Sequence, residues 1–269
     1  MFMQIEEIEL IYFSPTGTSK KIAEAVATGI GVKTHHTDLT PPSASTIKRN
    51  IKGDQLAVFA VPVYGGRVPE TASMRLSNIK GDATPSVIIV VYGNRAFDDS
   101  LLELHDIVAS KGFRTVAAAA FVAEHSYSSA ETPIAAGRPD AMDLEKAREF
   151  GAQVAIKLKS GVLDEPNIPG NKHYTERFRA TTDPKPAPIS PETKVDVCTL
   201  CGVCETVCPT RAISVSDQVS TVKENCIRCA ACVKICPTGA RVWEVDRIKN
   251  AATWLSTEFK DRKEPKTFL

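Results

Sequence analysis

The stretch YFSPTGTSKK, from Tyr12 to Lys21, follows an apolar run and precedes a segment with helical periodicity. A strand that ends in a loop of serine, threonine and glycine and then opens a helix can bind a phosphate, because the first N–H groups of the helix lack backbone partners. The hydroxyls of Ser14, Thr16 and Ser19 would add to such a site. The stretch lacks the Gly-Lys-Ser/Thr ending of a nucleoside-triphosphate loop. An ordinary serine or threonine helix cap is the alternative interpretation.

Short apolar runs alternate with amphipathic segments up to about residue 160. The apolar runs predict five strands, at residues 8–13, 33–39, 56–61, 87–92 and 116–122. The amphipathic segments predict helices at residues 19–30, 69–79, 98–111 and 140–160. This alternation predicts an α/β fold with a doubly wound, five-stranded parallel sheet and helices on both faces.

All eight cysteines lie in the last third of the chain, where one motif occurs twice. CTLCGVCETVCPT (residues 198–210) and CIRCAACVKICPT (residues 226–238) share the pattern CxxCxxCxxxCP, displaced by 28 positions. In this motif three cysteines bind one [4Fe–4S] cluster and the fourth binds the other cluster. We therefore expect two clusters in a small α+β domain, held by Cys198, Cys201, Cys204 and Cys236 and by Cys208, Cys226, Cys229 and Cys232. Zinc sites and disulfides are the weaker alternatives, because the first use separated CxxC pairs and the second an oxidising compartment.

Two further loops follow the third and fourth predicted strands. They contain Pro62, Val63, Tyr64, Gly65 and Gly66 in the first and Tyr92, Gly93, Asn94, Arg95 and Phe97 in the second. Ligands of doubly wound sheets bind beyond the carboxyl ends of the strands, so the three loops together predict a site for a mononucleotide with a planar ring. Tyr64, Tyr92 and Phe97 are candidates to stack on the ring, with packing at the sheet edge as the alternative.

With these residues in place, the first 160 residues resemble flavodoxin, whose phosphate loop has the form S/T-x-T-G-x-T/S. The resemblance implies an FMN cofactor with its phosphate on Ser14, Thr16, Gly17, Thr18 and Ser19. It also implies that the loops at residues 62–68 and 92–97 flank the isoalloxazine ring. The cysteine-rich segment resembles bacterial two-cluster ferredoxins. Over nearly its full length, the chain resembles the flavodoxin–ferredoxin fusion proteins of anaerobes (the EFR-type family), through SPTGTSKKIAEAV, PVYGGRVPE, YGNRAFDDSL, AEHSYS and the cysteine-rich tail.

The segment AEHSYSSAETPIAAGRPD (residues 123–140) follows the fifth predicted strand and is long for a loop in this fold. His125 and Tyr127 are candidate catalytic residues that relay a proton to the flavin or to a substrate. A loop that only covers the cofactor is the alternative. Arg67 and Arg95 are candidates to balance an anionic reduced flavin or to bind an acidic substrate, with plain surface exposure as the alternative.

The composition divides the chain into four parts. Residues 1–160 form the predicted FMN domain, and residues 161–194, with six of the 17 prolines, form a predicted linker. Residues 195–241 form the predicted 2[4Fe–4S] domain, and residues 242–269 a C-terminal helix and a charged tail.

The net charge of +1 indicates neither a nucleic-acid partner nor an anionic membrane surface. No run approaches the roughly 20 apolar residues that span a bilayer, and the N-terminal MFMQIEEIELIYF lacks the features of a signal peptide. We expect a cytoplasmic protein whose partner is a redox protein or a small-molecule electron acceptor, with a homodimer as an open alternative.

Flavin and iron–sulfur chemistry complement each other, because a cluster exchanges one electron and a flavin one or two. The first hypothesis is an electron-transfer flavoprotein that moves low-potential electrons between the clusters and FMN in an anaerobic cytoplasm. The second is an FMN-dependent reductase of a small organic acceptor such as a quinone, a nitro compound or an enone. The third is a redox sensor with residues 247–269 as its output element. Direct oxidation of NADH is not expected, because no GxGxxG motif opens a helix.

Overall fold

The computed structural model describes residues 5–174 and 187–269, so residues 175–186 of the predicted linker and the first four residues lie outside the described part. The strands are β1 Glu7–Tyr12, β2 Lys33–Asp38, β3 Arg49–Ile51, β4 Leu56–Pro62, β5 Ile79–Gly81, β6 Thr84–Tyr92, β7 Phe113–Val122, β8 Glu192–Thr193, β9 Ile213–Val215, β10 Val219–Thr221, β11 Arg241–Val242 and β12 Lys266–Phe268. The α-helices are α1 Thr18–Ile30, α2 Glu70–Leu76, α3 Ser100–Ala109, α4 Ala141–Ser160, α5 Val203–Thr206, α6 Ala231–Lys234 and α7 Asp246–Glu258. Short 3₁₀ turns cover Pro42–Thr46, Val195–Val197 and Lys223–Asn225.

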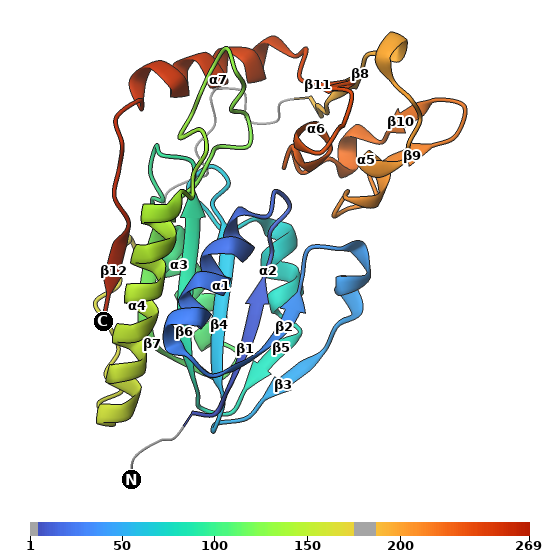
Figure 1. Ribbon diagram of the computed structural model, residues 1–269. Coiled ribbons are helices and arrows are strands. Elements are labelled where there is room, and N and C mark those ends of the chain that lie inside the picture. Colours follow the sequence, from blue (N-terminus) through green and yellow to red (C-terminus); the bar gives the residue numbers. More distant parts are fainter. Residues whose placement is uncertain (1–4, 175–186) are drawn as a thin grey trace.

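The main sheet has the order β12-β7-β6-β4-β1-β2 (Figure 1). Its five longer strands run parallel, and numbered among themselves they stand in the order 2-1-3-4-5. This is the flavodoxin-like order, with a ligand site at the point where the strand order reverses. The predicted α/β fold class is confirmed.

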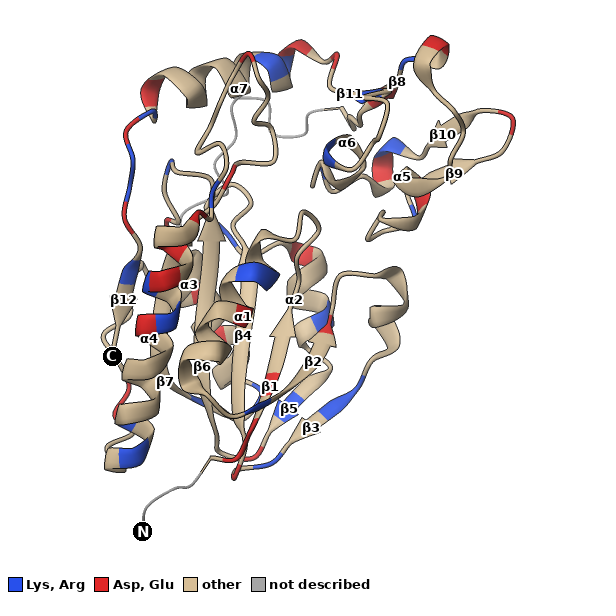
Figure 2. Cartoon of the chain, viewed as in Figure 1, with Lys and Arg blue, Asp and Glu red and all other residues tan. Residues whose placement is uncertain are grey.

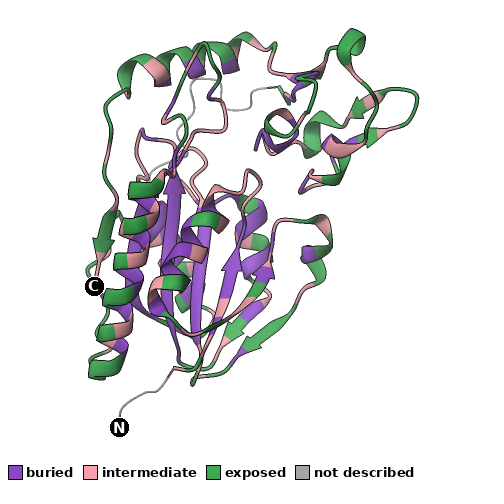
Figure 3. Cartoon of the chain, viewed as in Figure 1, coloured by how far each residue is buried: buried purple, intermediate pink, exposed green. Residues whose placement is uncertain are grey.

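The central strands are buried on both faces, which is why they are continuous apolar runs. All nine residues of β6 are buried (Figure 3), and β4 and β6 carry no charged side chain (Figure 2). Helices α1 and α4 cover one face, and α2 and α3 cover the other. Two glycines let α1 and α4 touch: a Cβ at Gly29 would lie 2.0 Å from the Arg148 carbonyl oxygen, and one at Gly151 would lie 2.1 Å from that of Val26.

Two parts of the fold differ from the sequence-based prediction. The predicted helix at residues 69–79 ends at Leu76, because the chain turns so that Ile79 enters the core in a strand and is fully buried there. That strand, β5, pairs in parallel with β3, and neither was predicted. The charged tail contributes a sixth strand to the main sheet, since β12 pairs antiparallel with Ala118–Ala120 of β7.

The repeated cysteine motif is also a repeat of structure. Elements displaced by 28 residues correspond: α5 with α6, β9 with β11, and β10 with β8. The 3₁₀ turn Val195–Val197 likewise corresponds to the 3₁₀ turn Lys223–Asn225. Positive φ angles recur at the same displacement, in the pairs Leu200/Arg228, Gly202/Ala230 and Arg211/Gly239. Six residues in left-handed conformation are therefore part of the repeat, although only two of them are glycine.

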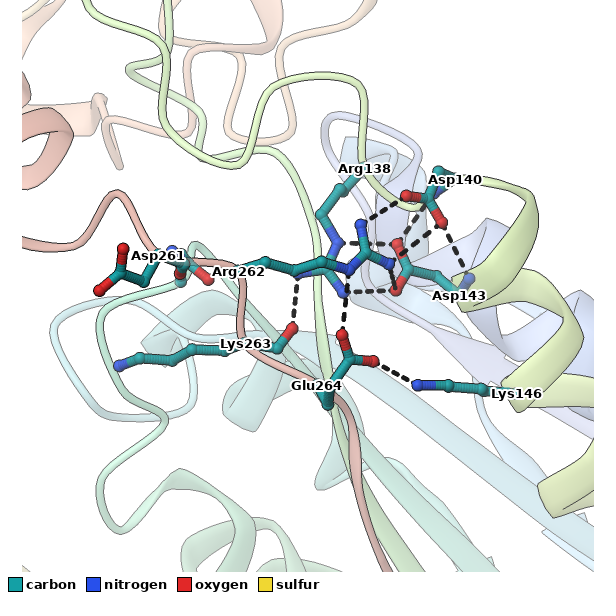
Figure 4. A network of polar contacts seen from close by, with 9 residues as sticks. Arg138, Asp140, Asp143, Lys146, Asp261, Arg262, Lys263 and Glu264 are labelled. Atoms are coloured by element: carbon teal, nitrogen blue, oxygen red, sulfur yellow. Dashed lines mark hydrogen bonds and ion pairs between the residues drawn. The ribbon is translucent and has the colours of Figure 1, made fainter.

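Helix α7 leaves the small domain, crosses above the carboxyl ends of the main-sheet strands and continues into residues 259–268, which we call the C-terminal strap (Figure 1). The strap descends beside α4 and ends in β12. Arg262 of the strap forms ion pairs with Asp140 and Asp143 at the start of α4, and the Arg138 guanidinium, which donates to the Lys263 carbonyl at 2.7 Å, also pairs with Asp143 (Figure 4). Within the described ranges, no helix has both the length and the apolar character needed to cross a bilayer.

Candidate functional site

A cavity of about 730 Å³ lies at the carboxyl ends of the parallel strands. Four loops line it, those after β1, β4, β6 and β7, together with the start of α2 at residues 69–74. Helix α7 and the second cysteine motif form its roof. Its volume is within the range of small-molecule and cofactor sites. The cavity therefore joins the three loops that the sequence singled out to two segments from the C-terminal part of the chain.

The loop after β1 divides its residues between lining the cavity and building the turn. Thr16 and Thr18 line the cavity. The Ser14 hydroxyl instead accepts a hydrogen bond from the Lys20 N–H at 3.0 Å, and Gly17 adopts φ +80° directly before α1. Ser19 is 1% exposed, and its hydroxyl has no partner among the described residues. Of the five predicted phosphate ligands, the structure places Thr16 and Thr18 at the cavity and the other three in the supporting turn.

The loop after β4 is a tight two-residue hairpin turn. The Tyr64 N–H donates to the Arg67 carbonyl at 2.9 Å, and the Arg67 N–H donates back at 3.3 Å. Gly65 and Gly66 between them have φ +59° and +80°, as a type I′ turn requires. A Cβ at Gly66 would also lie 2.2 Å from an Asp98 carboxylate oxygen. All five residues predicted in this loop, Pro62, Val63, Tyr64, Gly65 and Gly66, line the cavity.

The loop after β6 brings only part of its predicted set to the cavity. Tyr92, Gly93 and Arg95 line it, whereas Asn94 and Phe97 do not. Asn94 has φ +65° and is 2% exposed, and its amide group donates to the carbonyls of Phe259 at 2.5 Å and Asp261 at 2.9 Å. Phe97 packs edge-to-face on Tyr92, with ring centroids 5.6 Å apart. The sequence could not distinguish these two from true lining residues, because the strap that engages Asn94 comes from the other end of the chain.

His125 and Tyr127, the candidate catalytic pair, both line the cavity. Burial lowers the pKa of His125 to about 4, and the charges of Lys234 and Arg95 act in the same direction, so the ring is neutral near pH 7. The Tyr127 N–H donates to Nδ1 of His125 at 3.0 Å, which leaves the proton of the neutral imidazole on Nε2. Burial raises the pKa of Tyr127 to about 12. Near neutral pH, this pair therefore offers hydrogen-bond donors.

The arginines singled out from the sequence are engaged in ion pairs. The Arg67 guanidinium binds the Glu103 carboxylate through two bonds of 2.8 Å, and Arg95 pairs with Asp98. Arg228 and Arg247 also line the cavity, and neither enters an ion pair with a described residue. Neither was predicted from the sequence, since Arg228 lies inside a cysteine motif and Arg247 on a helix whose position over the cavity is a tertiary feature.

The eight cysteines form two groups, and none is disulfide-bonded. Cys198, Cys201, Cys204 and Cys236 line one small cavity. Cys229 interacts electrostatically with Cys232, Cys226 and Cys208, so these four thiols also lie together. Burial is the main reason that the pKa of Cys229 is raised to about 12. The sulfurs accept backbone hydrogen bonds as well, for example from the Ala212 N–H to Cys208 Sγ at 3.2 Å. The structure thus brings the cysteines of each predicted set near one another, and their role as cluster ligands stays a prediction.

Comparison with known proteins bears on both halves of the chain. Residues 197–240 match the family described as the 4Fe-4S dicluster domain. The chain thus joins a domain with flavodoxin-like strand order to a segment, residues 197–240, that is similar to 4Fe–4S dicluster domains. No curated protein sequence is significantly similar to it.

Solved structures similar to this chain share little sequence identity with it. A flavodoxin from Streptococcus pneumoniae TIGR4 is 16% identical, with 56% of this chain and 99% of that one covered and a TM-score of 0.38. Rubredoxin oxygen:oxidoreductase from Desulfovibrio gigas is 13% identical, with 61% and 38% covered and a TM-score of 0.39. An NAD(P)H:quinone oxidoreductase from Methanothermobacter marburgensis is 12% identical, with 56% and 96% covered and a TM-score of 0.35.

The dicluster domain meets the flavodoxin-like domain directly at the cavity. Cys226, Ile227 and Arg228 of the second cysteine motif belong to the cavity lining. Polar contacts join the domains nearby. The Lys234 ammonium pairs with Glu124 at 2.5 Å and donates to the Ser128 carbonyl at 2.7 Å, and the Arg75 guanidinium donates to the Pro209 carbonyl at 2.6 Å. A cysteine predicted to bind a cluster thus lies in the wall of the cavity predicted to bind a flavin.

Proposed function

We propose that the protein is an electron-transfer flavoprotein that binds FMN and two [4Fe–4S] clusters and moves low-potential electrons between them. The observation that carries the proposal is the position of Cys226, a member of the second cysteine group, in the wall of the 730 Å³ cavity. A cluster bound there shares a wall with the flavin, so electrons pass within one chain. Thiolate ligands of this kind persist in a reducing compartment, which favours the cytoplasm.

The residues present fit both cofactors. In the cavity, the hydroxyls of Thr16 and Thr18 and the N–H groups of Thr18 and Ser19 at the start of α1 suit a phosphate, while the Lys20 N–H is held by Ser14. Gly65 and Gly66 let backbone approach a flat ring. Tyr64 and Tyr92 are the aromatic residues of the predicted loops that line the cavity, and we assign ring contacts to them. FMN supplies the exchange of one or two electrons, which converts between single-electron and pairwise chemistry.

The two cysteine groups have different surroundings. Cys201 of the first group is exposed, and no member of that group lines the flavin cavity. Cys229 and Cys232 of the second group are buried. We assign the first cluster to exchange with an external redox partner and the second to exchange with FMN.

A reductase of a small organic acceptor is the second candidate function. The specific observation in its favour is that the Nε2–H of His125, Tyr127, and the unpaired arginines Arg228 and Arg247 belong to one cavity. In this role the chain would orient an acceptor carrying carbonyl, nitro or carboxylate oxygens beside the flavin. Loss of acceptor turnover in His125→Ala, with FMN retained, supports this function, and unchanged turnover contradicts it. The sensor hypothesis is less favoured, because residues 247–268 cover the cavity and pair with β7.

Anaerobic purification with cofactor analysis tests the main proposal. We expect about one FMN and about eight iron atoms per chain; zinc in place of iron, or no flavin, contradicts it. Two matched variants then test the route. Cys226→Ser should lower the iron content to about four and abolish fast reduction of FMN by the clusters. Cys201→Ser should lower the iron content equally but leave the cluster next to FMN able to reduce it.

A further inference from the structure

Arg241 is a buried cation between the two cysteine groups. Its side chain lines the small cavity that also contains Cys198, Cys201, Cys204 and Cys236, and its charge acts on Cys232 of the other group. Its charge also acts on Cys204 and Cys226, one thiol from each group. Arg241 is 3% exposed, so its guanidinium, which lies near both groups, is shielded from water.

The bonds that hold Arg241 follow the internal repeat. One terminal nitrogen donates to the Thr193 hydroxyl at 2.6 Å, and the other donates to the Thr221 hydroxyl at 3.2 Å. These two threonines are 28 positions apart, and so occupy equivalent places in the two halves of the repeat. A single guanidinium is therefore tied to both halves. The position equivalent to Arg241 itself is Ile213, so the cation occurs once in the repeat.

Nothing among the described residues balances this buried charge. Both threonine partners are neutral, and no carboxylate of the described chain pairs with Arg241. Its Nε is buried and has no hydrogen-bond partner there either. A buried charge is costly unless it is paired and its donors are satisfied. A cluster ligated by four thiolates is anionic and carries sulfur acceptors, so two clusters would supply what Arg241 lacks.

We propose that Arg241 is the shared counter-cation of the two clusters and raises the reduction potential of both. This inference rests on the proposed pair of clusters. Reduction adds one electron to a cluster and makes it more negative, and a fixed positive charge in a water-poor interior stabilises that state most. Hydrogen bonds to cluster sulfurs and local charge are known determinants of the potential. Arg241 is thus a positioning residue for electron flow, and it does not touch FMN.

Redox titration of the holoprotein, monitored by electron paramagnetic resonance, tests the proposal. In Arg241→Gln we expect the one-electron equilibrium constant for reduction of each cluster to fall at least tenfold, which is about 59 mV. Arg211→Gln is the matched control, because Arg211 is an exposed arginine at the end of the first cysteine motif and solvent screens its charge. Unchanged potentials in Arg241→Gln, or an equal shift in Arg211→Gln, would overturn the proposal.

A third variant covers the case in which Arg241→Gln fails to retain its clusters. Arg241→Lys keeps the charge but cannot bond both threonines in the same way. We expect it to retain about eight iron atoms. The equilibrium constant for reduction of each cluster should differ from that of the wild type by less than tenfold, which is a potential shift of less than about 59 mV. Loss of iron, or a full shift, in the lysine variant overturns the counter-cation role. Wild-type protein without eight iron atoms refutes the two-cluster proposal itself, and iron analysis recognises that outcome before any variant is compared.

Discussion

Helix α7 forms the roof of the cavity, and Asn94 ties the end of that roof to the loop after β6. The Asn94 amide donates to the carbonyls of Phe259 and Asp261 just beyond α7, at 2.5 and 2.9 Å. Asn94→Gly removes both bonds but suits the backbone, because φ is +65° and glycine adopts that angle without strain. Each bond contributes about 0.5–1.5 kcal/mol to holding α7 in place. The substitution also removes the Oδ1 of Asn94, which is buried without a hydrogen-bond partner, and this gain offsets part of the lost stabilisation. We expect local opening of α7 to become easier by about 1–2 kcal/mol.

Hydrogen–deuterium exchange measures this opening directly. The expected change corresponds to a drop of about 5- to 30-fold in the protection of amides in Asp246–Glu258, with β4 and β6 unaffected. Asn78→Gly is the matched control, because the Asn78 amide makes one exposed bond to the Ser45 carbonyl at 3.3 Å. Unchanged protection of α7, or an equal loss of protection throughout the chain, would refute the reasoning.

Three further predictions concern stability. Gly151→Ala should lower the free energy of unfolding by about 1–3 kcal/mol or more, because its Cβ would lie 2.1 Å from the Val26 carbonyl oxygen; denaturant titration measures this. Asp143→Ala should cost about 3–5 kcal/mol in the same assay, because it leaves the buried Arg138 guanidinium without its carboxylate. His125 has a folded pKa of about 4 against 6.5 in the unfolded chain, so its contribution is complete above pH 6.5 and is lost, by about 3 kcal/mol, as the pH falls to 4. His125→Asn should remove that part of the pH dependence.

Each of these predictions has an outcome that would contradict it, and the first also has a control variant. Gln153→Ala, at an exposed position on α4, should leave stability nearly unchanged, and a wild-type-like Gly151→Ala would contradict the proposed helix contact. A loss below about 1 kcal/mol in Asp143→Ala would show that Arg138 finds water or another partner. Parallel pH profiles of wild type and His125→Asn would contradict the burial of a neutral imidazole.

The elements predicted best are those whose sequence pattern reflects burial or local chemistry. The runs at β4 and β6 are continuously apolar because helices cover both faces of the sheet. Helix α4 begins at a capping box on Asp140 and ends at Gly161 with φ +74°, both of which are local signals. The spacing of the repeat also indicated which cysteines would lie near one another, and their assignment as cluster ligands stays a prediction.

The elements that escaped prediction depend on contacts between distant parts of the chain. Strand β12 has three residues and forms because β7 offers an open edge, which no pattern in KTF reveals. The position of α7 over the cavity is likewise a tertiary property, so its lining residue Arg247 could not be recognised. Arg241 lies five positions after the last cysteine, but only the structure shows that it bonds the equivalent threonines of both repeats.

The central claim is that electrons pass between the dicluster domain and FMN inside one chain, across the cavity wall formed at Cys226. Anaerobic laser-flash reduction of the clusters, followed at a wavelength where FMN reduction is visible, tests it most directly. The account predicts a first-order phase of FMN reduction whose rate constant does not change with protein concentration and which is absent in Cys226→Ser. A rate proportional to protein concentration, or clusters that stay reduced beside oxidised FMN despite a favourable potential difference, would contradict it.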